Sequence, residues 1–136
     1  MAEATRLVRD DSYEEMGHAY QCVQIAALDA ALQEHGVADP ALRQQVCESF
    51  VFNMGNLHDQ GWLKPSAESE PVYPLLCFSK LFLNTDTPVD QLGPVYAQAQ
   101  MFAYHESAFG NVGAFYEGDQ AAVVETGSFV REEEDA

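Results

Sequence analysis

Two consecutive segments with helical periodicity, each with a start and a stop signal, constrain the fold of this 136-residue chain most strongly. In the first segment, Ser12-Tyr-Glu-Glu15 matches a capping box, in which the Ser and Glu side chains bond to the backbone of the first turn. Apolar residues then recur at intervals of three and four up to Gly36, a residue type that ends helices. The sequence therefore predicts a helix over residues 13–35.

The second segment begins at Asp39-Pro40, because Asp caps helices well and Pro is tolerated in the first helical turn. Gly61 ends it, and Gly55 in its middle, which costs about 1 kcal/mol relative to Ala, indicates a close helix crossing. We predict a helix over residues 40–60, antiparallel to the first because the connection is short. Its apolar stripe comprises Leu42, Val46, Phe50, Met54 and Leu57, with Cys47 and Val51 beside it.

Two further helices are predicted beyond a polar loop at residues 64–71. The apolar run over 73–84 lacks the alternation of a half-exposed strand and is longer than a typical strand, which favours a buried helix. Residues 94–109 carry apolar side chains on two helical faces, and glycines interrupt the pattern afterwards. The predicted class is all-α, a four-helix bundle or an irregular α-domain over residues 1–130, followed by an acidic tail at 131–136.

The charge of the chain limits its partners. It has 22 Asp and Glu against 6 Lys and Arg, a formal net charge of -16. Direct binding to nucleic acid or to an anionic membrane needs a positive patch, so we expect neither. No apolar run has the length of a membrane span, no signal peptide precedes the first helix, and three cysteines without a CxxC motif are typical of a reducing compartment. We expect a cytoplasmic protein, and adaptation to high salt is an alternative origin of the acidity.

The charge is distributed unevenly. Residues 71–116 carry only four charged side chains but nine of the aromatic residues. Aromatic side chains with few Lys and Glu are typical of the centres of protein interfaces. Because symmetric pairing is the commonest way to cover such a surface, we expect a homodimer that uses this stretch.

No complete catalytic or cofactor motif is present, so we expect a protein that is not an enzyme and holds no cofactor. His105-Glu106 begins an HExxH motif, but Phe109 stands where the second His is required. Met54 with His58 and Met101 with His105 have the spacing of neighbours on a helix. An alternative function is therefore a helical-bundle protein that binds a metal or another ligand through these Met/His pairs.

The sequence favours a small acidic module that binds a basic protein, such as an inhibitor, an immunity protein or a chaperone. In this hypothesis carboxylates at the rim steer the encounter, and aromatic side chains form the centre of the contact. For each tyrosine, a place in the core with a bonded hydroxyl is an equally good interpretation. The candidate contact residues are Tyr96, Tyr104, Met101, Glu48, Asp59, Glu68 and Glu70.

Overall fold

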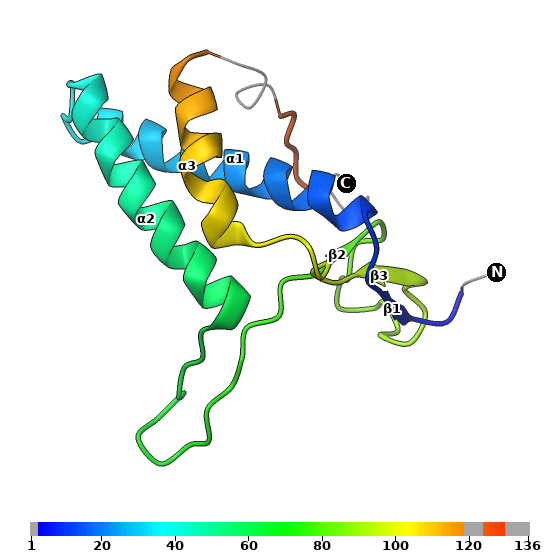
Figure 1. Ribbon diagram of the computed structural model, residues 1–136. Helices are drawn as coiled ribbons and strands as arrows, with labels where there is room; N and C mark the ends of the chain where they lie inside the picture. The colour runs from blue at the N-terminus through cyan, green and yellow to red at the C-terminus, as the bar shows by residue number, and fades with distance from the viewer. Residues whose placement is uncertain (1–2, 119–123, 130–136) are drawn as a thin grey trace.

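The computed structural model describes residues 3–118 and 124–129, which form three helices and a small mixed sheet (Figure 1). In chain order the elements are β1 (Arg6–Val8), α1 (Ser12–Glu34), α2 (Pro40–Gln60), β2 (Phe78–Ser79), β3 (Pro94–Tyr96) and α3 (Tyr104–Tyr116). The strand order is β1-β3-β2, with β3 parallel to β1 and antiparallel to β2. Figure 1 places the sheet at one end of the helical layer, beside the start of α1.

The predictions of an all-α class and of a four-helix bundle are wrong, because the described residues combine three helices with a three-stranded sheet. The first two helices are confirmed to within one residue. The acidic tail predicted at 131–136 lies outside the described residues. None of the described helices has both the length and the apolar character that crossing a membrane requires.

The helix predicted over 73–84 does not form. This segment is extended or irregular, and only Phe78–Ser79 pairs as a strand. An apolar run of this length does not distinguish a buried helix from extended chain, and Pro71 and Pro74 favour extended conformations in the residues before them. The burial on which the prediction depended is also missing, since Tyr73, Leu75 and Phe82 are exposed.

The helix predicted over 94–109 is displaced toward the C-terminus. Residues Pro94–Tyr96 instead form the central strand, where Val95 pairs with Leu7 of β1. Helix α3 begins only at Tyr104 and continues through Gly110 and Gly113, which cost stability in a helix but do not end it. The secondary structure of this region therefore depends on sheet pairing with residues far away in the sequence, which local periodicity does not show.

Of the two predicted helix caps, the structure confirms the one at Asp39 and contradicts the one at Ser12. The Asp39 carboxylate accepts a hydrogen bond from the Ala41 amide at 3.0 Å, as the cap prediction requires. The capping box at Ser12 is wrong, because Asp11 occupies the cap position and the Ser12 hydroxyl bonds to Asp10 instead. Helix α1 still starts within one residue of the predicted place, where the Asp10 carboxylate accepts from the Ser12 amide at 3.0 Å.

Two clusters of buried side chains form the core. The first lies among the three helices and consists of Ile25, Cys47, Val51, Ala108 and Val112. The second lies between the start of α1 and the sheet and consists of Tyr13, Ala99, Phe102 and Tyr104. Gly55 lets α2 approach the first turn of α3, because a Cβ at this position would lie 2.6 Å from the His105 amide nitrogen. The close crossing predicted from Gly55 is therefore confirmed.

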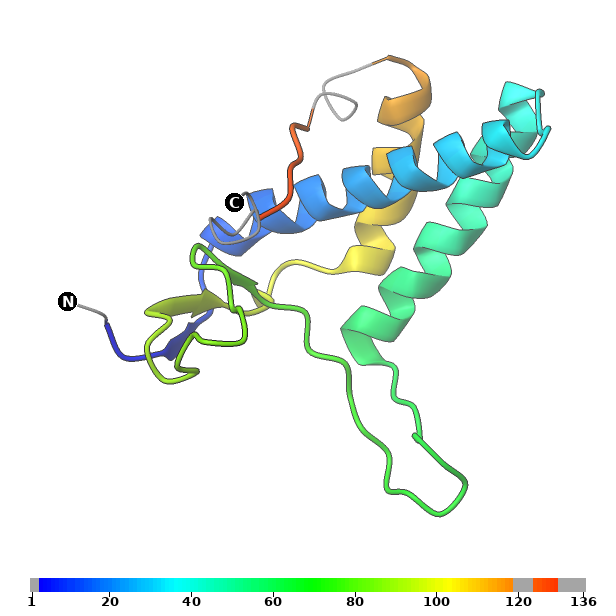
Figure 2. The same ribbon diagram turned by 180° about the vertical axis from the view of Figure 1, so that it is seen from behind.

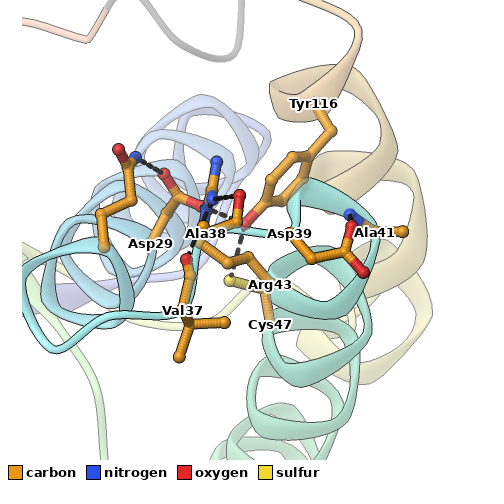
Figure 3. Close-up of polar contacts among 9 residues, drawn as sticks. Asp29, Val37, Ala38, Asp39, Ala41, Arg43, Cys47 and Tyr116 are labelled. Atoms are coloured by element: carbon orange, nitrogen blue, oxygen red, sulfur yellow. Dashed lines mark hydrogen bonds and ion pairs between the residues drawn. The ribbon is translucent and has the colours of Figure 1, made fainter.

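A buried carboxylate near the C-terminal end of α1 joins the three helices (Figure 3), and the sheet lies beside the other end of α1 (Figure 1). Asp29 of α1 accepts hydrogen bonds from Arg43 at 2.7 Å, from Gln33 at 2.7 Å and from the Tyr116 hydroxyl. Burial by itself would raise the pKa of Asp29, but the hydrogen bonds from Tyr116, Arg43 and Gln33 outweigh it and lower that pKa. Arg43 also donates to the Val37 and Ala38 carbonyls, which fixes the connection between α1 and α2.

Candidate functional site

A long hairpin-like segment between α2 and β2 extends away from the rest of the molecule in both views (Figures 1 and 2). We call residues 61–77 the arm. One bridge joins its two sides, in which Leu63 and Val72 exchange backbone hydrogen bonds of 2.9 and 2.8 Å. Its tip is closed by the hydroxyls of Ser66 and Ser69, 2.7 Å apart.

The arm exposes large apolar side chains on both of its sides. Their exposed fractions range from 44% to 69%. Single exposed apolar residues are common on protein surfaces, but several on one projecting segment indicate a surface for contact with another molecule. These arm residues are Trp62, Leu63, Val72, Tyr73 and Leu75.

A cavity of about 640 Å³, which we call the root cavity, lies where the arm joins the body. Both sides of the arm border it, through Gly61 and through Tyr73 to Leu75. The last turn of α2 and the segment between β3 and α3 complete its walls. Arg9 also borders the cavity and donates from Nε to the Gln98 carbonyl at 2.8 Å.

The Asp59 carboxylate, at the edge of the root cavity, caps helix α3 from outside that helix. Ala103 occupies the cap position of α3 and has no side-chain acceptor, so Asp59 of α2 accepts from the amides of Tyr104 at 2.9 Å and His105 at 2.8 Å. Gln98 Nε2 donates to the same carboxylate at 2.7 Å, and His105 Nδ1 pairs with it. Burial would raise the pKa of Asp59, but these hydrogen bonds outweigh it and lower that pKa.

The His58 ring borders the same cavity and has no polar partner. Both ring nitrogens are buried and make no hydrogen bond with any described residue. The ring instead packs against the aromatic rings of Tyr20 and Tyr104. Burial lowers the pKa of His58, and the nearby charge of Asp59 opposes this only in part.

Two of the candidate contact residues are buried and serve the fold. Tyr104 is 1% exposed, and its hydroxyl lies 2.7 Å from that of Tyr13, which donates to the Leu76 carbonyl. The core interpretation of Tyr104 is therefore the one that the structure supports. Asp59, predicted as a rim carboxylate, has a side chain only 7% exposed.

The other five candidate residues reach the surface at separate places. Glu68 and Glu70 are exposed on the arm, whereas Glu48 is half-buried on α2. Met101 is exposed just before α3. Tyr96 is half-buried in β3, and the Lys80 ammonium lies 5.7 Å from the centre of its ring. The structure thus brings together Glu68 and Glu70, but not the whole set.

One of the two Met/His pairs does not have the helical spacing that the sequence predicts. Met101 precedes α3, so it is not one helical turn from His105 as the predicted helix required. Within residues 3–118 and 124–129, no group of three or more His, Cys, Asp or Glu side chains could hold a metal ion. His58 and His105 nevertheless border one cavity, although from different helices.

Sequence reasoning missed the apolar side chains of the arm. Their signal is a set of large apolar residues on both sides of the polar run KPSAESEP, which by itself indicates only a loop.

In the comparisons with known proteins, no protein family model, no curated protein and no solved structure matches the chain.

Proposed function

We propose that this protein is a binding module that attaches to a basic protein partner through the arm. The observation that carries the proposal is the set of five exposed apolar side chains on a segment that projects from the body. Trp and Tyr, both present in this set, are the residue types that most often dominate the binding energy of interfaces. Trp62 and Tyr73 are therefore the proposed anchors.

The charge of the molecule supports a basic partner. The net charge is -16, and the arm itself carries Glu68 and Glu70 against one Lys64. A negative field attracts a positively charged protein and speeds its association, with an effect that weakens as salt is added. The apolar arm would then supply the contact that slows dissociation.

The construction of the arm also fits a surface completed by a partner. A two-stranded hairpin is marginally stable in water, and a single bridge holds this one. Contact with another protein would bury its apolar side chains and add the packing that it lacks in isolation.

The test is a binding measurement with matched variants. The wild-type chain is used to isolate its partner from the native cell, and the purified partner is then titrated with each variant. Trp62→Ser or Tyr73→Ser should weaken binding by about 2 kcal/mol or more, mainly through faster dissociation. Phe50→Ser removes a comparably exposed ring on α2, 43% exposed, and should leave the affinity unchanged.

Charge steering is tested in the same assay. Glu68→Gln and Glu70→Gln should slow association by less than about tenfold each and change dissociation little. Binding that is unchanged between about 50 and 500 mM salt, or that survives loss of both Trp62 and Tyr73, would rule out the proposal.

We also propose self-association through the charge-poor stretch 71–116. Several of its apolar side chains are exposed, among them Leu81, Leu83 and Val89. Symmetric pairing would cover them at the part of the chain where like charges oppose contact least. Sedimentation velocity should show a dimer below about 1 mM, and a monomer throughout that range would exclude it.

A further inference from the structure

His58 is the feature that the proposed function does not explain. A neutral imidazole has one N–H donor and one acceptor nitrogen, and both are buried here without a partner. Buried polar side chains nearly always have a hydrogen-bond partner, so an exception of this kind calls for a reason. The position of the ring, in the last turn of α2 directly before the arm, suggests one.

The groups that pack against His58 form no hydrogen bond with it, and the nearby charge of Asp59 favours its protonated form only in part. Tyr20 of α1 meets the ring nearly edge-on at 6.2 Å between centroids, and Tyr104 of α3 lies at 5.4 Å. The neighbouring carboxylate, Asp59, is already occupied by hydrogen bonds from Gln98 and from the first turn of α3. Aromatic faces attract a cation more weakly than burial of an unpaired charge disfavours it.

The remaining charged and titratable groups that border the cavity are two basic residues and the phenol of Tyr73. Arg9 and His105 border the root cavity together with His58. An imidazolium at His58 would therefore share the cavity with a guanidinium and a second histidine. Burial without a hydrogen-bond acceptor therefore favours the neutral form of His58.

The arm and this ring border the same cavity. The arm begins at Gly61, three residues after His58, and its returning side, Tyr73 to Leu75, borders the same cavity. Both ring nitrogens are covered in this structure, although the ring itself borders the cavity.

We propose that His58 is a pH-sensitive switch for the arm: neutral His58 keeps the arm root closed, and protonation opens the root and frees the arm to reorient. The inference rests on the proposed function, in which the arm is the binding element, and it adds regulation of that element by acid.

The direction of the pH effect depends on whether His58 binds a proton more readily in the closed or in the open form of the arm root. Burial lowers the pKa of His58 in the closed form, whereas an open root would return it toward the ordinary value of about 6.5. The closed root is therefore fully stable above about pH 6.5 and loses stability as the pH falls below it. The ratio of open to closed forms should rise by up to about tenfold per pH unit until the pKa of the closed form is passed.

The chain contains its own probe for this motion. Trp62 is the single tryptophan and lies four residues after His58, at the start of the arm. Its fluorescence should change as the isolated wild-type protein is taken from about pH 8 to about pH 5, while the helical circular dichroism stays constant. His58→Phe keeps an aromatic ring but cannot be protonated, so the fluorescence change should disappear. His35→Phe makes the same substitution at an exposed position and should behave as wild type.

Three results would overturn the switch: a flat wild-type fluorescence profile, an unchanged profile in His58→Phe, or loss of helix together with the fluorescence change. If His58→Phe does not fold, NMR titration of the wild-type protein decides, since a His58 that titrates at or above about 6.5 is not buried in neutral form. The partner takes no part in these measurements, so failure of the switch is separate from failure of partner binding.

Discussion

At the scale of single residues, the Asp29 carboxylate connects α1 to the N-terminal end of α2 and to the C-terminal end of α3. It accepts from Arg43, Gln33 and Tyr116, and its side chain is only 8% exposed. Asp29→Asn would leave the Arg43 guanidinium without its charged partner, and we expect it to lower the free energy of unfolding by about 3 kcal/mol at neutral pH. Urea denaturation measures this value directly.

The same variant gives a pH dependence with a defined sign. Because hydrogen bonds lower the pKa of Asp29 in the folded state, its contribution is fully present above the ordinary Asp value of about 3.9. The stability difference between wild type and Asp29→Asn should shrink as the pH falls through the lowered pKa. Glu34→Gln is the control, because Glu34 is exposed, pairs with the exposed His35 and should change stability by less than about 0.5 kcal/mol.

Residue types could be predicted from the sequence better than residue environments. Asp39 was identifiable as a cap because its acceptor lies two residues away along the chain. Asp59 was not, because the amides that it caps are about 45 residues further on, and Tyr104 likewise finds its hydroxyl partner 91 residues away. Whether a charged or aromatic side chain lies at the surface or in the core depends on such distant partners, which the local sequence does not reveal.

At the scale of elements, the crossing of α2 and α3 depends on Gly55. A Cβ added there would meet the His105 backbone at 2.6 to 2.8 Å, so the two helices would have to separate. We expect Gly55→Ala to lower the free energy of unfolding by about 2 kcal/mol, as overpacking of a core does.

Gly113→Ala in α3 is the matched control for this crossing. Nothing lies within 4 Å of a Cβ at Gly113, so the better helix propensity of Ala should raise stability by up to about 1 kcal/mol. Chemical denaturation of both variants compares them, and a stabilising Gly55→Ala would contradict the close crossing.

The elements that could be predicted are those whose signals are local. Helices α1 and α2 have periodic apolar residues and nearby start and stop residues, and both form where expected. The buried face of α2 differs from the predicted stripe, because Leu42 and Phe50 are exposed while Cys47 and Val51 are buried. The sheet escaped prediction because strands of two and three residues are too short to show alternation and depend on distant partners.

At the scale of the whole molecule, negative charge exceeds positive charge, with 22 Asp and Glu against 6 Lys and Arg. In residues 3–118 and 124–129, the one ion pair between a carboxylate and Lys or Arg is Asp29 with Arg43, and it is largely buried. Salt weakens a buried pair much less than it weakens repulsion between exposed carboxylates. Added salt therefore removes a destabilising force without removing a comparable stabilising one.

We accordingly expect the melting temperature to rise with moderate salt. The net charge of -16 opposes the compact state, and the range of that repulsion falls from about 30 Å at 0.01 M salt to about 8 Å at 0.15 M. Differential scanning calorimetry over this range measures the shift. NaCl and KCl should act equally at equal ionic strength, because screening does not depend on the identity of the cation. A melting temperature that stays flat or falls would show that repulsion among the carboxylates is not a significant term in the stability of this fold.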